Sequence, residues 1–312
     1  MRHLPAVFFA LLIAAAAIAS PARDARALPL PGAPRCPVFP RSNAFNQRVD
    51  ALPVAADSAA IVSSIGLGGS MHADFGSGIY DGGPIGIPFD VVGRRTPRSR
   101  VTFDYSAESD HVRYPIPRGV HVEGGPNASG DRHAILVDRD ACRLFELYDL
   151  RRTGTGWHAG SGAAWSLRSN HVRPAGWTSA DAAGLPIFPG LARYDEARRG
   201  RIDHALRFTV ARTRRAYVYP ARHFASDLTD PALPRMGERL RLKRTVDVSR
   251  FPPQARIVLR ALQRYGMIVA DNGSNWFISG APSPGWDNDQ LATLRRIHGS
   301  DFGVVDTSSL PR

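Results

Sequence analysis

Hydrophobic and polar residues alternate over most of the chain in short runs, which is the pattern of half-buried strands. The runs are rich in β-branched and aromatic residues, and glycine, proline, asparagine or aspartate separates them. The clearest pair is 267–280, where Asn272-Gly273 lies between two apolar runs and predicts a β-hairpin. The pattern predicts further strands at 89–92, 100–105, 121–123, 133–137, 144–148, 164–167, 203–210, 216–220 and 239–246.

Helical periodicity is limited to a few short segments. The strongest is 253–265, which Pro253 opens and Gly266 closes, with its apolar residues recurring on one face. Asp57 and Asp287 stand where N-caps are expected. The other predicted helical segments are 58–65, a turn at 179–183 and 288–297.

Many strands and few helices predict a mainly β protein. We expect a single β-sandwich or jelly-roll-like domain at 36–248. A small α+β appendix at 249–312 is expected to pack on that same domain. No repeat of 20–50 residues and no long linker divides the chain.

The N-terminus has the layout of a secretory signal peptide. A short basic start, Arg2-His3, precedes an apolar run at 4–19, and small-residue cleavage patterns end at Ala19 and Ala27. We therefore expect a signal peptide at 1–27, a proline-rich lead-in at 28–35, and a secreted, extracellular or periplasmic protein. An uncleaved N-terminal membrane anchor is the alternative, because signal-anchors have similar runs.

Export changes the interpretation of the two cysteines, Cys36 and Cys142. Two cysteines in an oxidising compartment most simply form one disulfide. The chain-entropy model gives a cross-link over a loop this long about 4–5 kcal/mol of stabilisation.

Composition is that of a globular protein, with 43% hydrophobic and 9% aromatic residues among 312. The formal net charge of +12 suggests a polyanionic partner. However, Lys243 is the only lysine among 40 basic residues, a skew typical of GC-rich codon usage. The arginines are scattered and accompany no nucleic-acid-binding motif, so we expect no nucleic-acid partner. A basic surface still suits acidic glycans or a polyanionic cell wall.

The stretch 130–149 combines a predicted hairpin with ionisable residues. A turn at 140–141 places Ile135 opposite Glu146 and His133 opposite Tyr148. Glu146 is then either on a solvated face or in a polar cleft on a sheet face. In a cleft its raised pKa would suit a general acid.

Two other stretches carry acids in loop-like surroundings. Asp81 lies in a glycine-rich segment, 72–88, that is either a glycine-bent loop or a ligand-binding loop. Asp181 follows Trp177 in WTSAD, where it belongs either to a helix cap or to a site.

Aromatic and basic side chains cluster between residues 156 and 226. Trp157 and Trp177 stand beside glycine and polar residues, which favours flat platforms for sugar rings over core positions. His204 is either a hydrogen-bonded core histidine or a binding residue. The candidate substrate-binding residues are Trp157, Trp177, His204, Tyr219, Arg222 and His223.

Several segments resemble a family of secreted bacterial proteins, mostly from GC-rich organisms. They span nearly the whole chain after Cys36 and include YDGGPIGIPF, GDRHAILVD, WTSADAAGLPIFPGLARYDE, IDHALRFT and ADNGSNWFISG. The resemblance implies export and a single folded unit, and it transfers no catalytic residue.

Together these features favour a secreted carbohydrate-active enzyme, specifically a glycoside hydrolase that uses paired carboxylates. Asp81, Glu146 and Asp181 are the candidates for the acid, base or nucleophile. The alternatives are a uronate polysaccharide lyase and a non-catalytic glycan-binding protein. We expect a monomer that binds a polysaccharide or cell-wall glycan and needs no cofactor or metal.

Overall fold

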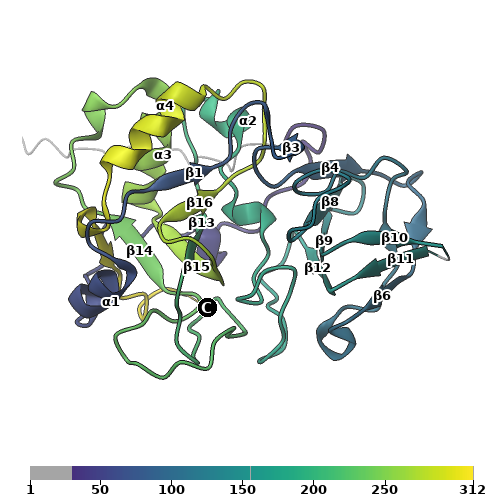
Figure 1. Ribbon diagram of the computed structural model, residues 1–312, viewed down its shortest axis with the longest axis horizontal. Coiled ribbons are helices and arrows are strands. Elements are labelled where there is room, and N and C mark those ends of the chain that lie inside the picture. The colour runs from purple at the N-terminus through teal and green to yellow at the C-terminus, as the bar shows by residue number, and fades with distance from the viewer. Residues whose placement is uncertain (1–29, 155, 312) are drawn as a thin grey trace, which may run out of the picture.

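The computed structural model describes residues 30–154 and 156–311, so the expected signal peptide lies outside the described residues. Strands make up 26% of the chain and helices 17%, which confirms a mainly β protein. Figure 1 shows two lobes side by side: one contains a large sheet with helices, and the other contains smaller sheets.

The first lobe is built on a six-stranded mixed sheet. The apolar side chains of its inner strand β13 (Leu206–Val210) are almost fully buried, as expected of a strand covered on both faces. This strand runs parallel to one neighbour and antiparallel to the other. In spatial order the strands are β1 (His72–Asp74), β16 (Phe277–Ser279), β13 (Leu206–Val210), β15 (Met267–Asn272), β14 (Arg239–Leu242) and β17 (Phe302–Val304).

The helices of this lobe follow the expected local signals. α3 (Pro253–Arg264) starts at its proline and buries its apolar face, including Val258 and Leu262, in the core of the lobe. The Asp287 side chain accepts hydrogen bonds from the Asp289 and Gln290 amides and so caps α4. The remaining helices are α1 (Ser58–Ile65), α2 (Tyr194–Ala197) and α4 (Asn288–Ala292), the last continuing as a short 3-10 turn over Thr293–Arg296.

The Asn272-Gly273 hairpin prediction is wrong. β15 and β16 are adjacent in sequence but not in space, because β13 lies between them. The Gly273 amide donates to the Val210 carbonyl at the end of β13, so the chain passes over that strand before returning. The pairing of β13 with both β15 and β16 therefore outweighs the local turn signal of Asn272-Gly273.

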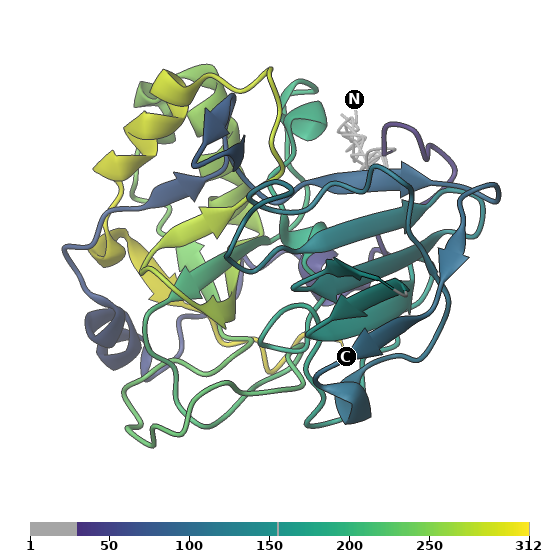
Figure 2. The ribbon, with the colours of Figure 1, turned by 45° about the vertical axis from the view of Figure 1, so that its right-hand side comes forward.

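The second lobe contains a four-stranded and a three-stranded sheet, whose teal strands come forward in Figure 2. Each sheet includes one parallel pair, β4 with β8 and β6 with β11. The sheets are mixed, and the expected β-sandwich or jelly-roll-like domain is not confirmed. The four-stranded sheet comprises β12 (Ser161–Ser166), β9 (Arg143–Tyr148), β8 (Ala134–Asp138) and β4 (Phe89–Val92); the other comprises β10 (Arg151–Thr153), β11 (Gly156–Ala159) and β6 (Val101–Phe103).

Two small pairs complete the described strands. β2 (Ile79–Tyr80) pairs with β3 (Gly83–Pro84), and β5 (Arg98–Ser99) pairs with β7 (Tyr114–Pro115). The predicted strands at 121–123 and 216–220 are irregular instead.

Sequence-distant parts of the chain share the six-stranded sheet. The segment after residue 249 supplies β15, β16 and β17 to it, and the earlier chain supplies β1, β13 and β14. The C-terminal segment is thus part of the main sheet of the first lobe, although it was expected to pack as an appendix.

The β8–β9 hairpin has the predicted register, with Ile135 opposite Glu146. The predicted disulfide is present: Cys36 is bonded to Cys142 in the hairpin turn. Among the residues the structure describes, no helix has the length and apolar character needed to cross a bilayer.

Candidate functional site

A polar cavity of about 430 Å³ lies where the two lobes meet, and we call it the junction pocket. The second lobe contributes Tyr148 of β9 and the segment before β8, and the first lobe contributes Asp271 and Asn272 at the end of β15. The charged and aromatic residues that line it are Tyr105, Glu108, Asp131, His133, Tyr148, His223 and Asp271.

The loop at 178–183 joins the two sides of the junction pocket. The Ser161 hydroxyl on β12 donates to the Ser179 carbonyl, and the Ala183 amide donates to the Ala270 carbonyl on β15. The loop is therefore hydrogen-bonded to one strand of each lobe, and it connects the two sides of the junction pocket.

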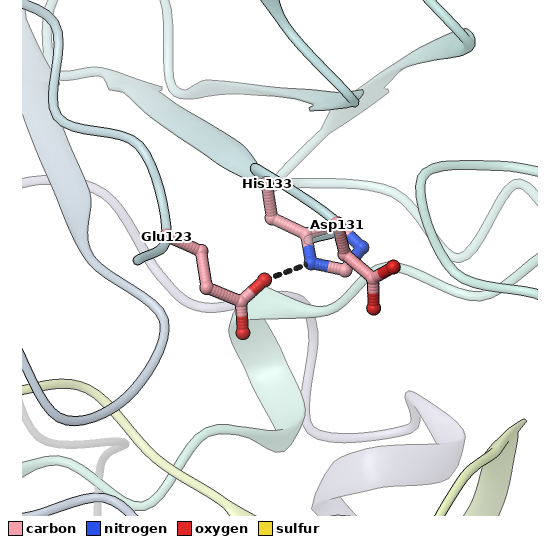
Figure 3. A group of neighbouring side chains, drawn as sticks. All are labelled: Glu123, Asp131 and His133. Atoms are coloured by element: carbon pink, nitrogen blue, oxygen red, sulfur yellow. Dashed lines mark hydrogen bonds and ion pairs between the residues drawn. The ribbon is translucent and has the colours of Figure 1, made fainter. Parts of the chain in front are cut away.

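His133 is buried at one wall of the pocket, and both of its ring nitrogens are hydrogen-bonded; Figure 3 shows the bond to Glu123. Nδ1 donates to Glu123 at 2.5 Å and Nε2 donates to the Ala180 carbonyl at 2.9 Å. Burial opposes a charge on the ring, but the Glu123 carboxylate outweighs it and raises the pKa of His133 to about 9. The side chain therefore supplies a fixed positive charge behind the pocket.

Glu123, Asp131 and His133 also have the donor types of a divalent-cation site. One ligand atom of each lies within 4.8 Å of the others, as Figure 3 illustrates. The bond from Nε2 to the Ala180 carbonyl would orient the ring for a cation on Nδ1. A cation there would first have to displace the Nδ1 proton and the Glu123 ion pair.

Arg207, on β13, lies buried beneath the pocket and binds two carboxylates. Its Nε and one terminal nitrogen donate to the two oxygens of Asp181, each at 3.0 Å. The same terminal nitrogen also donates to Asp271 at 2.9 Å, and the other one donates to the Ser279 hydroxyl. A planar guanidinium is suited to this forked arrangement.

Asp271 is the carboxyl through which this buried network reaches the pocket. Its side chain is 22% exposed, and burial raises its pKa to about 6 despite the opposing charge of Arg207. Across the pocket, burial and the charges of Asp131, Asp149 and Asp271 raise the pKa of the Tyr148 hydroxyl. A carboxyl that titrates near neutral pH therefore faces a phenol and a second, exposed carboxylate.

The three acids expected to be catalytic do not meet in one groove. Asp81 is exposed in the turn between β2 and β3. Glu146 is fully buried, and its two oxygens accept hydrogen bonds from the Ile187 and Phe188 amides. Asp181 is also buried, with both oxygens on Arg207.

Glu146 is on neither a solvated face nor an open cleft. The β9 face that carries it packs into an apolar core with Leu144 and Tyr148 on either side. Burial raises its pKa to about 8, although the two amide hydrogen bonds favour the charged form.

Of the expected substrate-binding residues, the structure places His223 in the junction pocket, where Nδ1 donates to the Ala182 carbonyl. His204 is buried and paired with Glu196 at 3.0 Å. The Arg222 Nε donates to the Arg173 carbonyl. Trp157, Trp177 and Tyr219 are half-buried and lie outside the pocket lining.

Sequence reasoning missed Glu108, Asp131 and Asp271 as pocket residues. Asp131 lies two residues before the predicted strand that starts at His133, and Asp271 lies next to the turn of the predicted hairpin. The convergence of the three residues depends on long-range packing, and only Asp131 and Asp271 carry a local signal, their position near strand ends.

Comparison of the chain with known protein families, with curated proteins and with solved structures finds no match.

Proposed function

We propose that the protein is a carbohydrate-active enzyme, specifically a glycoside hydrolase that acts in the junction pocket. The supporting observation is that the carboxyl groups of Glu108, Asp131 and Asp271 line one concave site together with the rings of Tyr105 and Tyr148. Paired carboxyl groups beside aromatic rings are the usual equipment for cleaving a glycosidic bond.

In this proposal Asp271 is the general acid. Its burial and its pKa of about 6 keep part of the population protonated near neutral pH, ready to protonate the leaving oxygen. Arg207 holds the carboxyl in place through a 2.9 Å hydrogen bond. Because this hydrogen bond keeps the Asp271 carboxyl in one orientation, proton transfer from Asp271 to the leaving oxygen needs no rotation of the side chain.

Asp131 is the second carboxylate in this proposal. It is exposed to the pocket, where it acts on the anomeric carbon directly or through a water. One oxygen of Glu108 accepts a hydrogen bond from the Thr178 amide, which orients the carboxylate. The carboxylate is then a partner for sugar hydroxyls.

The carboxylates of Glu108 and Asp131 favour an uncharged sugar, because they would repel a uronate and the charge of His133 is offset by Glu123. Tyr148 provides a flat face at the pocket wall.

The experiment measures new reducing ends released from a panel of neutral glycans by the wild-type protein and two variants. We expect Asp271→Asn and Asp131→Asn each to lower the rate by about 10²-fold or more, the usual size of a general acid–base contribution. The control is Asp81→Asn in the exposed β2–β3 turn, which should retain the full rate. Release of no reducing ends from any substrate contradicts the proposal.

Two other outcomes also count against hydrolysis. Products that absorb as unsaturated uronates would indicate the lyase chemistry considered as an alternative. Saturable binding of a glycan without turnover would indicate a glycan-binding protein. Glu146→Gln and Asp181→Asn test the assignment made from the sequence, because both side chains are buried and neither lines the pocket. A loss of rate in folded variants would show that these acids take part in the reaction.

A further inference from the structure

A second depression, of about 670 Å³, lies in the second lobe and shares no lining residue with the junction pocket. It is formed around β5, β7, β10 and β11, and Figure 1 shows β10 and β11 on the side of the lobe away from the first lobe. We call it the arginine groove, after the five arginines that line it: Arg98, Arg100, Arg113, Arg118 and Arg152.

The arginine groove has an uncompensated positive charge. Among the residues that the structure describes, no aspartate or glutamate lines it. Arg98 is paired with the buried Asp138 at 2.5 Å. Within residues 30–154 and 156–311, no ion pair joins the other four arginines to a carboxylate, and all four are exposed.

Strand geometry explains why these arginines project outward. Val101 and Tyr114 are buried, so their neighbours Arg100 and Arg113 point to the other side of the chain. The Tyr114 hydroxyl donates to the Asp110 carbonyl at 2.7 Å, which fixes the buried side of this strand. Arg100 and Arg113 thus directly precede short strands whose first residues, Val101 and Tyr114, are buried.

A smaller depression adjoins the arginine groove. It shares Arg100 and Arg113 with the groove and adds His111, and its lining within the described part of the chain holds no acid. At the other side, the Arg152 guanidinium lies over the Trp157 ring, 5.8 Å from its centre. The arginine groove thus combines several guanidinium groups with the aromatic side chain of Trp157.

We propose that the arginine groove binds an anionic polysaccharide that carries sulfate or carboxylate groups. Guanidinium groups bind such anions through paired hydrogen bonds, and arginine is the residue suited to that geometry. Trp157 adds a ring against which a sugar can pack. This function goes beyond the proposed hydrolysis, because the groove would hold the protein on a charged polymer while the pocket acts on uncharged sugar.

The compartment favours a polysaccharide over a nucleic acid as the polyanion. The Cys36–Cys142 disulfide is typical of an oxidising environment outside the cytosol. Polysaccharides, with sulfate or uronate groups, are the abundant polyanions there.

The experiment measures binding of the mature protein to heparin, to polygalacturonate, to neutral dextran and to duplex DNA at several salt concentrations. The groove variant is the triple substitution Arg100→Gln, Arg113→Gln and Arg118→Gln. The matched control is Arg256→Gln, Arg260→Gln and Arg264→Gln on α3, which removes the same charge from another surface.

We expect the wild type to bind at least one anionic glycan, with an affinity that falls as salt rises, and not to bind dextran. The groove variant should bind it about tenfold or more weakly, while the control should change about twofold or less. Equal losses in both variants would mean that net charge alone drives binding, and would overturn the proposal. Tighter binding of DNA than of either glycan, lost in the groove variant, would overturn the choice of partner.

Discussion

Arg207 uses its guanidinium on three partners at once: Asp181, Asp271 and Ser279. The two carboxylates outweigh the cost of burial and raise the pKa of Arg207 above its usual range, so the side chain stays charged. Its charge in turn lets a partly exposed Asp271 and a fully buried Asp181 lie close together beneath the pocket. One cation therefore determines how two acids are held.

Replacement of Arg207 should expose that dependence. In Arg207→Gln the two carboxylates lose their charge partner, and we expect the free energy of unfolding to fall by about 3–5 kcal/mol. Urea denaturation measures the change, and Arg260→Gln on the exposed face of α3 should shift it by less than about 0.5 kcal/mol. A loss below about 1 kcal/mol for Arg207→Gln would show that the network does not depend on this side chain.

Glu146 gives the protein a specific pH dependence. Burial raises its pKa to about 8 in the folded chain, against 4.5 for an unburied glutamate. The folded state therefore binds the proton more tightly than the unfolded state, and this stabilisation is complete below about pH 4.5 and is lost as the pH rises to about 8.

A Glu146→Gln variant removes that titration. Between pH 5 and 8, the free energy of unfolding of the wild type should fall relative to that of the variant by up to about 1.4 kcal/mol per pH unit. Comparing the difference at each pH cancels the fixed cost of the substitution. The exposed Asp227→Asn variant serves as the control. A pH-independent difference for Glu146→Gln would contradict the assignment.

At the scale of elements, the β8–β9 hairpin connects most of the second lobe's features. Its turn carries the disulfide to the N-terminal segment, and its buried β9 face carries Glu146 into the core. Its outer end carries Tyr148, whose ring centre lies 5.8 Å from that of His133 at the pocket wall. A displaced hairpin would therefore disturb both the core and the junction pocket.

Removal of the disulfide tests this connection. The double variant Cys36→Ser, Cys142→Ser should lose about 3–5 kcal/mol of unfolding free energy, because the cross-link closes a separation of 106 residues. The loss is measured by denaturation of both proteins under non-reducing conditions. Reductant should lower the stability of the wild type and leave the variant unchanged, and equal stability of the two proteins would contradict the prediction.

Local signals in the sequence predict several elements well. The end of α1 at Gly66 follows from a local signal, whereas the Asp57 side chain makes no capping hydrogen bond. The start of α3 at Pro253 also follows from a local signal, and the register of β8 with β9 follows from alternation. The position of β13 between β15 and β16 does not, because a strand's neighbours depend on which apolar surfaces fit together.

The same limit applies to the candidate site. Asp131, Tyr148 and Asp271 meet only after the two lobes have packed together. The sequence indicates Glu146 and Asp181 as candidate catalytic acids. In the structure the oxygens of Glu146 accept hydrogen bonds from backbone amides, and those of Asp181 accept hydrogen bonds from Arg207. Sequence patterns identify ionisable residues, and the fold decides which of them face a ligand.

At the scale of the whole molecule, two separate surfaces follow from the arrangement of the lobes. The junction pocket lies between them and is rich in carboxyl groups, and the arginine groove lies in the second lobe and is rich in guanidinium groups. Opposite charges at separate sites fit one account, in which the protein is held on an anionic polymer and acts on uncharged sugar.

The most direct test of the account is a crystal structure of the Asp271→Asn variant with an oligosaccharide that the wild type cleaves. We predict a sugar ring in the junction pocket, against Tyr148 and within hydrogen-bond distance of Asp131. An oligosaccharide bound at another surface, with the junction pocket holding no sugar, would contradict the central claim.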